Sequence, residues 1–368
     1  MTDTALQDYI TRGAEAIVAD AVRAVLRDPR EAAFMAKFAA ASRRASEKRM
    51  RSEKEGLHVP TFLIASITSA CNLHCAGCYS RAEHRTEDCK PVRQLTAEDW
   101  DRVFFEAEDM GVSFILLAGG EPLLRRSVME KATAHPSLLF PVFTNGTYLD
   151  GKYFDLFDSH RNLVPVISTE GGRFRTDERR GEGVYDTLRR NMEEFSRRGL
   201  IWGTSVTVTR NNLEEVMSPS FTEDLTELGC RLFIYVEYVP VTEDTLCLAP
   251  EDAERARMAD AVEQLRRDHP DALFLSFPGD EKASDGCLAA GRGFFHINSH
   301  GGAEPCPFSP YSDVNVKETS LRAAMESGLF RKIREGGLLL EEHAGGCTLF
   351  ARRQEVEALT GDNPSENP

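Results

Sequence analysis

The chain has 368 residues, of which 41% are apolar and 28% are charged, a composition that indicates a folded protein rather than a disordered one. Its 59 acidic and 44 basic residues give a formal net charge of −15, which repels phosphate backbones and argues against a general nucleic-acid binder. No apolar run approaches the roughly 18 residues needed to cross a bilayer. Because no secretion leader is visible at the N-terminus, we expect a cytoplasmic location.

Residues 1–57 are predicted to form a helical extension. Apolar residues recur near the helical period up to Asp28-Pro29, and a second stretch carries Phe34 and Phe38 one turn apart. We expect these helices to cover the main domain. An amphipathic helix that contacts a partner or a membrane surface is the alternative.

From residue 61 onward, short β-branched or apolar runs alternate with longer helical patterns. The predicted strands are Phe62–Thr68, Phe114–Ala118, Leu138–Thr144, Val164–Ser168, Thr204–Thr209 and Leu232–Val239. The helical stretches between them include Thr96–Met110, Tyr185–Arg198 and Leu213–Leu228, and Thr96 with Asp99 resembles a capping pattern at the start of the first. Six strands that alternate with helices indicate βα units and one parallel sheet. We therefore expect an α/β fold, with an open, partial (β/α)6 barrel over residues 58–270.

The alternation of strands and helices stops near residue 270. Downstream, the pattern predicts a strand at 273–277, a hairpin that joins 294–298 to Glu304, and helices at 319–335 and 350–359. We predict a small α+β domain over residues 271–360, followed by a disordered tail over residues 361–368.

Three of the nine cysteines lie directly after the first predicted strand, where Cys71, Cys75 and Cys78 have the spacing C-x3-C-x2-C. Sites in α/β folds are built at the carboxyl ends of parallel strands. Three thiolates on one short loop can hold three irons of a [4Fe-4S] cluster and leave the fourth iron open for another ligand. The alternatives are structural zinc, which prefers four ligands in two close pairs, and three structural cysteines placed by chance.

This loop resembles the signature of the radical S-adenosylmethionine (SAM) superfamily, and the resemblance extends over roughly residues 60–245. As in that family, three further segments fall at the ends of the following predicted strands. They are Gly119-Gly120-Glu121-Pro122, Thr144-Asn145-Gly146 and Ser168-Thr169-Glu170-Gly171. Each of these segments, taken alone, is most often an ordinary turn. Together they support the resemblance, because they follow the cysteine loop at the ends of successive predicted strands.

The resemblance implies that residues on these loops bind SAM. The Gly-Gly-Glu-Pro turn would hold the SAM amino group, with Glu121 orienting it, and Ser168 and Glu170 would contact the ribose and the methionine part. The family often has an aromatic residue where this chain has Gly77, and we expect Tyr79 to supply that packing. The implied SAM contacts are Tyr79, Gly119, Gly120, Glu121, Asn145, Ser168, Glu170, Thr207, Asn212 and Val239.

The same resemblance implies the chemistry. The iron left open by Cys71, Cys75 and Cys78 chelates SAM, the reduced cluster donates one electron, and cleavage of the sulfonium C–S bond yields a 5'-deoxyadenosyl radical. This radical abstracts a hydrogen atom from a peptide or small-molecule substrate at the barrel mouth. The electron donor is expected to be a flavodoxin- or ferredoxin-like protein.

A second set of cysteines, Cys287, Cys306 and Cys347, lies in the C-terminal segment among many glycines. Glycine lets a backbone wrap closely around an inorganic core. The pattern resembles the SPASM and shorter twitch domains of radical SAM enzymes. Because the central cysteine-rich run of SPASM is absent, the resemblance implies one auxiliary Fe–S cluster, expected to be [4Fe-4S]. Unrelated structural cysteines are the alternative.

The fourth ligand of this auxiliary cluster is not evident from the sequence. The usual twitch pattern would place a further cysteine close to the third, but the residue there is Phe350. Either a distant side chain completes the cluster or one iron is open to substrate. The candidates for a distant ligand are Cys89, Cys230, Cys247 and His343.

Two other classes of function compete with a radical SAM enzyme: an Fe–S electron-transfer or scaffold protein without SAM chemistry, and a zinc-stabilised binding module. The Gly-Gly-Glu-Pro and Ser-Thr-Glu segments argue against the scaffold protein, and both cysteine spacings argue against zinc. Among substrates, the N-terminal extension is shorter than the winged-helix domain that peptide-modifying members often carry, which weakens the case for a peptide.

Overall fold

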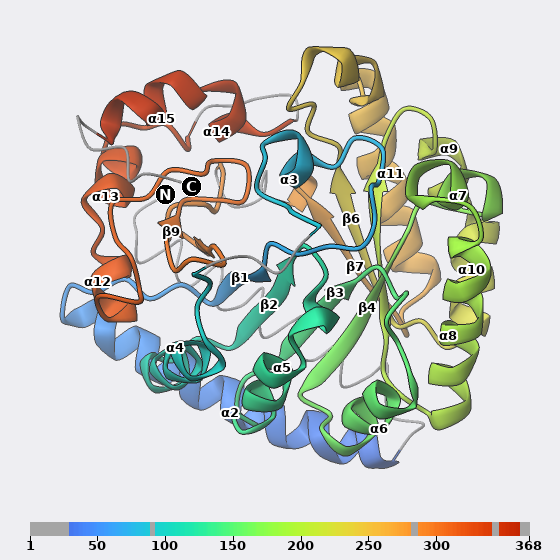
Figure 1. Cartoon of the computed structure of the whole chain (residues 1–368), viewed down its shortest axis with the longest axis horizontal. Coiled ribbons are helices and arrows are strands. Elements are labelled where there is room, and N and C mark those ends of the chain that lie inside the picture. Colours follow the sequence, from blue (N-terminus) through green and yellow to red (C-terminus); the bar gives the residue numbers. More distant parts are fainter. Residues whose placement is uncertain (1–28, 89–92, 281–285, 341–345, 361–368) are drawn as a thin grey trace.

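The computed structural model of the protein (Figure 1) describes residues 29–88, 93–280, 286–340 and 346–360. The predictions for residues 1–28 and for the tail lie outside the described residues. The strands are β1 (Phe62–Thr68), β2 (Phe114–Gly119), β3 (Phe140–Thr144), β4 (Leu163–Thr169), β5 (Gly203–Val208), β6 (Leu232–Glu237), β7 (Leu273–Phe277), β8 (His296–Ile297) and β9 (Ala303–Glu304). They form one sheet in the order β7-β6-β5-β4-β3-β2-β1-β8-β9.

The main part of this sheet is parallel, as the alternation of strands and helices indicates. All six expected strands are present, with ends displaced by no more than two residues. The strand predicted at 273–277 is confirmed as β7, which pairs in parallel with β6 and places Leu273 opposite Leu232. The parallel part of the sheet therefore extends beyond the six strands expected for it. Strand β7, just beyond residue 270, pairs with β6 of the main sheet. The domain boundary expected near residue 270 stays a prediction.

The C-terminal hairpin is confirmed, and its position is informative. Strands β8 and β9 are antiparallel, with His296 opposite Glu304. Strand β8 also pairs in parallel with β1, where Ile64 lies opposite His296. The hairpin thus extends the main sheet beside the strand that leads into the first cysteine loop.

Helices cover the outside of the curved sheet, as Figure 1 shows for α4, α5, α6, α8 and α11. The helices and 3-10 turns are α2 (Pro29–Lys54), α3 (Tyr79–Ala82), α4 (Ala97–Met110), η1 (Pro122–Arg125), α5 (Arg126–Thr133), α6 (Gly151–Ser159), α7 (Arg173–Arg180), α8 (Val184–Arg198), α9 (Leu213–Val216), α10 (Pro219–Glu227), η2 (Glu243–Leu248), α11 (Asp252–Asp268), α12 (Leu321–Met325), α13 (Gly328–Glu335), α14 (Thr348–Ala351) and α15 (Arg353–Leu359).

Local sequence explains where these helices begin and where one expected helix divides. The start of α4 carries the capping box expected from its sequence, in which Thr96 and Asp99 exchange side-chain and backbone hydrogen bonds. The stretch Leu213–Leu228, expected as one helix, is split into α9 and α10. The cause is Pro219, which occupies the first turn of α10 after the capping residue Ser218 and is unfavourable inside a continuous helix.

The core between the sheet and its helices is aromatic. Phe104 packs edge-on against Phe140 of β3, and Phe195 of α8 stacks with Trp202 just before β5. All four side chains are fully buried. Burial of such large side chains contributes about 1.5–3 kcal/mol each and fixes the strands that carry the site.

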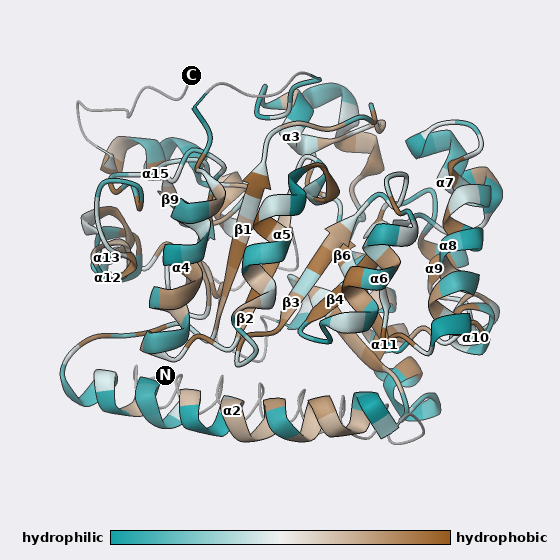
Figure 2. Ribbon diagram, turned by 60° about the horizontal axis from the view of Figure 1, so that its bottom comes forward, coloured by the Kyte–Doolittle hydropathy of each residue, from teal (hydrophilic) through white to brown (hydrophobic). Residues whose placement is uncertain are grey.

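Helix α2 lies across the end of the sheet opposite the carboxyl ends of the strands (Figure 2). Phe38 packs edge-on against Phe114, the first residue of β2, at 5.5 Å between ring centroids. Arg49 is only 1% exposed, and its guanidinium donates to the Gly111 carbonyl and to Ser113 Oγ. These contacts join α2 to the loop that precedes β2. Among the described residues, no helix is both long and apolar enough to cross a membrane.

Arg49→Met should lower the free energy of unfolding by about 2–3 kcal/mol, because it removes a buried charged donor from the Gly111 carbonyl. Chemical denaturation measures this loss. The exposed Arg44 on the same helix provides the control, and Arg44→Met should change stability by no more than about 0.5 kcal/mol. Equal losses in both variants would contradict the role given to Arg49.

Candidate functional site

The first cysteine loop leaves the carboxyl end of β1 and is fixed by backbone contacts. The Cys71 amide donates to the Glu87 carbonyl at 3.0 Å, and the Cys78 amide donates to the Cys75 carbonyl at 3.2 Å. The Arg81 guanidinium donates back to the Cys71 carbonyl at 3.0 Å. All three cysteines are partly buried. The loop is therefore held in shape by protein groups at the carboxyl end of the parallel strands.

The donor chemistry of this loop fits an Fe–S cluster. In the described part of the chain, no three His, Cys, Asp or Glu side chains converge on the position of a single metal ion. A cubane cluster makes a different demand, because each thiolate binds a different iron. Burial raises the pKa of the Cys71 thiol, so a cation beside it is needed to stabilise the thiolate. Cys71, Cys75 and Cys78 are the residues that would hold the cluster.

The Gly-Gly-Glu turn is joined directly to the end of β1. The Gly120 amide donates to the Thr68 carbonyl at 2.7 Å, and the Glu121 amide donates to the Ala70 carbonyl at 2.8 Å. A Cβ atom at Gly120 would lie 2.2 Å from the Ala70 oxygen, so no side chain fits there. Gly119, at φ +118°, is similarly close to the Thr68 carbonyl. The turn thus lies beside Cys71 because it lacks side chains at two successive positions.

Glu121 uses its carboxylate to hold neighbouring strand ends together. It accepts hydrogen bonds from Thr144 Oγ1 at 2.7 Å, from the Asn145 amide at 2.8 Å and from the Leu123 amide at 3.0 Å. Burial raises the pKa of Glu121, while these three hydrogen bonds favour its charged form. The carboxylate therefore positions the ends of β2 and β3, and its expected contact with the SAM amino group stays a prediction.

Asn145 connects the end of β3 to the cysteine loop. Its side-chain amide donates to Asn72 Oδ1 at 3.0 Å and lies 3.9 Å from Cys71 Sγ. Its side-chain oxygen, Oδ1, accepts from the amide and the hydroxyl of Thr147. The structure thus brings together three features expected from sequence: the cysteine loop, the Gly-Gly-Glu turn and the Thr-Asn-Gly triplet.

Glu170, after β4, is part of a buried ionic cluster that sequence reasoning missed. Its Oε1 accepts from Arg179 and Arg180 of α7, each at 2.5 Å, and the carboxylate is only 1% exposed. Its Oε2 has no hydrogen-bond partner among the described residues. The expected role of Glu170 as an acceptor for SAM stays a prediction. The basic run after the fourth strand was the signal that could have revealed the two arginines.

Arg179 also belongs to the surroundings of the cysteine loop. Its carbonyl accepts from the Ala76 amide at 2.8 Å. Burial lowers the pKa of Arg179, but the charges of Glu170 and Cys75 outweigh burial and raise it. A buried guanidinium that stays charged offsets the negative charge that thiolates and an Fe–S cluster would bring.

The remaining expected SAM contacts lie along the same edge of the sheet. Ser168 and Thr207 are partly buried near the ends of β4 and β5. The Asn212 side chain donates to the Glu170 and Thr207 carbonyls at 3.0 Å each. It therefore joins the ends of β4 and β5. Val239 is buried two residues beyond β6.

The second set of cysteines also comes together. Cys306 is buried, its thiol is hydrogen-bonded to that of Cys347, and Cys287 is close enough for its charge to act on Cys306. The Cys347 hydrogen bond, burial and the neighbouring thiols raise the pKa of Cys306. Gly286, at φ +115°, leaves room for the Leu339 carbonyl, which a Cβ there would approach to 2.1 Å. Buried thiols that crowd one another fit a metal-cluster site.

The structure describes two of the four distant candidates for the fourth ligand of the auxiliary cluster, Cys230 and Cys247. Cys230 is buried in the core before β6 begins, at the opposite end of that strand from the site, and its Sγ contacts the Leu232 carbonyl. It is therefore not a ligand, and burial raises the pKa of its thiol to about 12. Cys247 is exposed in η2. Cys89 and His343 lie outside the described residues.

The two sets of cysteines are connected through α3. Tyr79 packs on Phe308 at 4.7 Å between ring centroids, and it lies near both Cys78 and Cys306. Arg85 donates to the Pro307 carbonyl and to Glu304, at 2.7 Å each. The residues after the first loop therefore dock on the residues that carry Cys306. Tyr79 thus contacts the C-terminal segment, and its expected adenine packing stays untested.

A buried polar chain runs from this junction into β1. Glu304 accepts from Arg85, and its Oε2 lies 2.7 Å from His296 Nδ1. The other ring nitrogen of His296 lies 2.7 Å from Ser66 Oγ. Burial lowers the pKa of His296, whereas the Glu304 charge opposes that shift. These residues fix β8 and β9 against β1, and the sequence patterns used above did not identify them.

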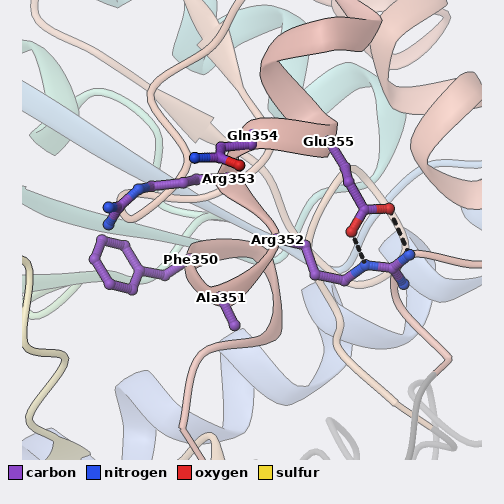
Figure 3. Close-up of a pocket in the computed structure, with 6 residues that line it drawn as sticks. All are labelled: Phe350, Ala351, Arg352, Arg353, Gln354 and Glu355. Atoms are coloured by element: carbon purple, nitrogen blue, oxygen red, sulfur yellow. Dashed lines mark hydrogen bonds and ion pairs between the residues drawn. The ribbon is translucent and has the colours of Figure 1, made fainter.

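A cavity of about 350 Å³ lies at the start of α15, beyond Cys347. In Figure 3 the guanidinium of Arg353 lies over the Phe350 ring, and Arg352 is paired with Glu355. These contacts use the charges that line the cavity, and we assign no ligand to it.

Comparison with known proteins agrees with this geometry. Residues 65–218 match the model of the Radical SAM superfamily. The chain is 25% identical to the AdoMet-dependent heme synthase of Methanosarcina barkeri, over 84% of this chain and 96% of that protein. It is also 25% identical to the pre-heme d1 synthase of Dinoroseobacter shibae, over 83% and 85% of the two chains. Two further relatives, the Fe-coproporphyrin III synthase of Methanosarcina barkeri and the mycofactocin maturase MftC of Mycolicibacterium smegmatis, match over 38% and 41% of their own length.

The fold has solved counterparts. SuiB of Streptococcus suis, in its complex with the precursor peptide SuiA, matches with a TM-score of 0.63 at 19% identity, over 83% of this chain and 71% of SuiB. The family match and the relatives support a radical SAM protein with a mixed α/β fold built on a largely parallel sheet. A [4Fe-4S] cluster and SAM, the cofactors expected from the sequence, are those that this family uses.

Gly120→Ala should lower the free energy of unfolding by about 2–3 kcal/mol, because its Cβ would overlap the Ala70 carbonyl next to Cys71. It should also reduce the iron bound after anaerobic reconstitution. Gly151→Ala is the matched control, since that position opens α6 and has nothing within 4 Å of an added Cβ. A Gly120→Ala protein as stable and as iron-rich as the control would contradict the close contact.

Proposed function

We propose that the protein is a radical SAM enzyme that abstracts a hydrogen atom from its substrate and carries one auxiliary Fe–S cluster. The observation that carries the proposal is the junction of the cysteine loop with the Gly-Gly-Glu turn, through the backbone contacts at Thr68 and Ala70. An Fe–S electron-transfer protein has no need of a glycine turn beside its ligand loop, or of a buried carboxylate such as Glu170 with one oxygen that lacks a partner among the described residues.

The residues divide the work as follows. Cys71, Cys75 and Cys78 would hold three corners of the SAM-binding cluster. When bound, the cluster and SAM supply a 5'-deoxyadenosyl radical. The Gly119–Glu121 turn lies beside the loop, which supports its expected contact with the SAM amino group. Glu170 Oε2, which has no hydrogen-bond partner among the described residues, would accept from a hydroxyl or ammonium donor.

Cys287, Cys306 and Cys347 would hold the auxiliary cluster. Tyr79 lies near both Cys78 and Cys306, and Arg85 donates to the Pro307 carbonyl; these contacts support a second site next to the first. Proximity of this kind suits electron transfer between the two sites, or binding of substrate to an open iron between them. The proposal includes a cytoplasmic location and a flavodoxin- or ferredoxin-like electron donor.

For the substrate, the extent of the matches favours a small molecule. Two relatives that are aligned over more than four fifths of this chain are named for heme-type products. A peptide is the second candidate, favoured by the fold similarity to SuiB in complex with a precursor peptide. Incubating the reconstituted enzyme and SAM with heme precursors or with a peptide encoded beside its gene separates these classes, since the true substrate should become modified while 5'-deoxyadenosine accumulates.

Cys71→Ala should abolish the formation of 5'-deoxyadenosine from SAM under a strong reductant and lower the iron content from about eight to about four per chain. Chromatography of the nucleoside and iron analysis measure the two effects. Cys230→Ala is the control, because that buried thiol lies far from the site and its loss should leave the iron content unchanged. Turnover of SAM by a Cys71→Ala protein would refute the proposal.

Cys306→Ala should also lose about four irons but keep SAM cleavage that is uncoupled from substrate. The reason is that Cys306 belongs to the second set of thiols, which does not hold the SAM-binding iron. Parallel assays of 5'-deoxyadenosine and of substrate consumption measure this uncoupling. If Cys306→Ala and Cys71→Ala lose SAM cleavage equally, the division between the two clusters is wrong.

A further inference from the structure

The middle of the first cysteine loop has no side chain because another residue fills its space. Gly77 lies between Cys75 and Cys78 with φ at +66°, a left-handed conformation that favours glycine. A Cβ atom built there would lie 2.5 Å from the hydroxyl oxygen of Tyr238 and about 3 Å from two carbons of its ring. The phenol of Tyr238 therefore lies directly against the loop.

The position of Tyr238 is fixed by the sheet. It follows β6 directly, and its amide donates to the Val208 carbonyl at the end of β5 at 2.9 Å. The side chain is only 3% exposed. A ring that leaves the sheet at its carboxyl edge and is buried against Gly77 has little freedom to move.

The hydroxyl of Tyr238 is buried and lacks a hydrogen-bond partner among the described residues. Burying a hydroxyl without a partner costs free energy, so such groups are normally paired. Tyr235, within β6, follows that rule and donates to the Val216 carbonyl at 3.3 Å. The unpaired donor of Tyr238 faces the segment between two of the proposed cluster ligands.

We propose that Tyr238 is a positioning residue of the SAM-binding cluster: its ring supports the loop at Gly77, and its hydroxyl donates a hydrogen bond to a sulfur of the bound cluster. The inference rests on the proposed function. A hydrogen bond to sulfur stabilises the more negative, reduced state of a cluster and so raises its reduction potential. Tyr238 would therefore make the cluster easier to reduce.

The test compares Tyr238→Phe with Tyr235→Phe and the wild-type holoprotein. Both variants remove one buried tyrosine hydroxyl from β6 or from the residue that follows it, but only the Tyr238 hydroxyl faces the loop. Tyr238→Phe should keep the full iron content, and at a fixed potential its ratio of reduced to oxidised SAM-binding cluster should fall about tenfold, equal to ~59 mV for a one-electron couple. Tyr235→Phe should not change this ratio.

The readout is the electron paramagnetic resonance signal that responds to added SAM, because this response separates the SAM-binding cluster from the auxiliary one. In deuterated buffer, an exchangeable deuteron coupled to the reduced cluster should be present in the wild type and missing in Tyr238→Phe. An unchanged ratio and unchanged deuteron coupling, or an equal shift in Tyr235→Phe, overturns the inference. A wild-type protein that binds no iron or does not cleave SAM instead overturns the proposed function.

The steric half of the inference has its own test. Gly77→Ala should lose iron from the SAM-binding site, because the new methyl group displaces Tyr238 or the loop. Gly56→Ala is the matched control, since Gly56 has φ at +84° but nothing within 4 Å of an added Cβ. It carries the same backbone strain without the collision, and its iron content should stay at the wild-type level. Equal iron in the two variants overturns the contact between Tyr238 and the loop.

Discussion

The candidate site depends on the contact between the Gly-Gly-Glu turn and the end of β1. Gly120 and Ala70 meet backbone to backbone, with no space for a Cβ atom between them, and the Glu121 amide completes the contact. This contact sets the position of Cys71 relative to the end of β2. Through the Glu121 carboxylate, it also sets the end of β3. Three strand ends are thus located by one short segment that carries almost no side-chain volume.

Much of this arrangement could be predicted from the sequence, because it depends on local patterns. Alternating apolar runs gave the strands, the Thr96–Asp99 box gave the start of α4, and the cysteine spacing gave the loop. The errors also had local causes. Pro219 divided an expected helix, and the strand predicted at 273–277 was assigned to the C-terminal domain because the alternation of strands and helices stops near residue 270, whereas it pairs with β6.

The contacts missed from the sequence are those between residues that are distant along the chain or carry no recognisable motif. Arg179 and Arg180 reach Glu170 only because α7 folds back over the end of β4. Arg85 reaches Glu304 across more than 200 residues of sequence. Tyr238 contacts Gly77 only because β6 and β1 end at the same edge of the sheet. Contacts of this kind can be identified only once the fold is known.

The pairing of β8 with β1 has a consequence for how the chain can be divided. β1 lies between β2 and β8, and its residue Ile64 donates its amide to the Phe295 carbonyl at 3.0 Å. A truncated protein that ended near residue 270 would leave one side of β1 with unsatisfied backbone groups, and exposed strand edges of this kind promote aggregation. The parallel sheet and the C-terminal segment are therefore best expressed as one unit.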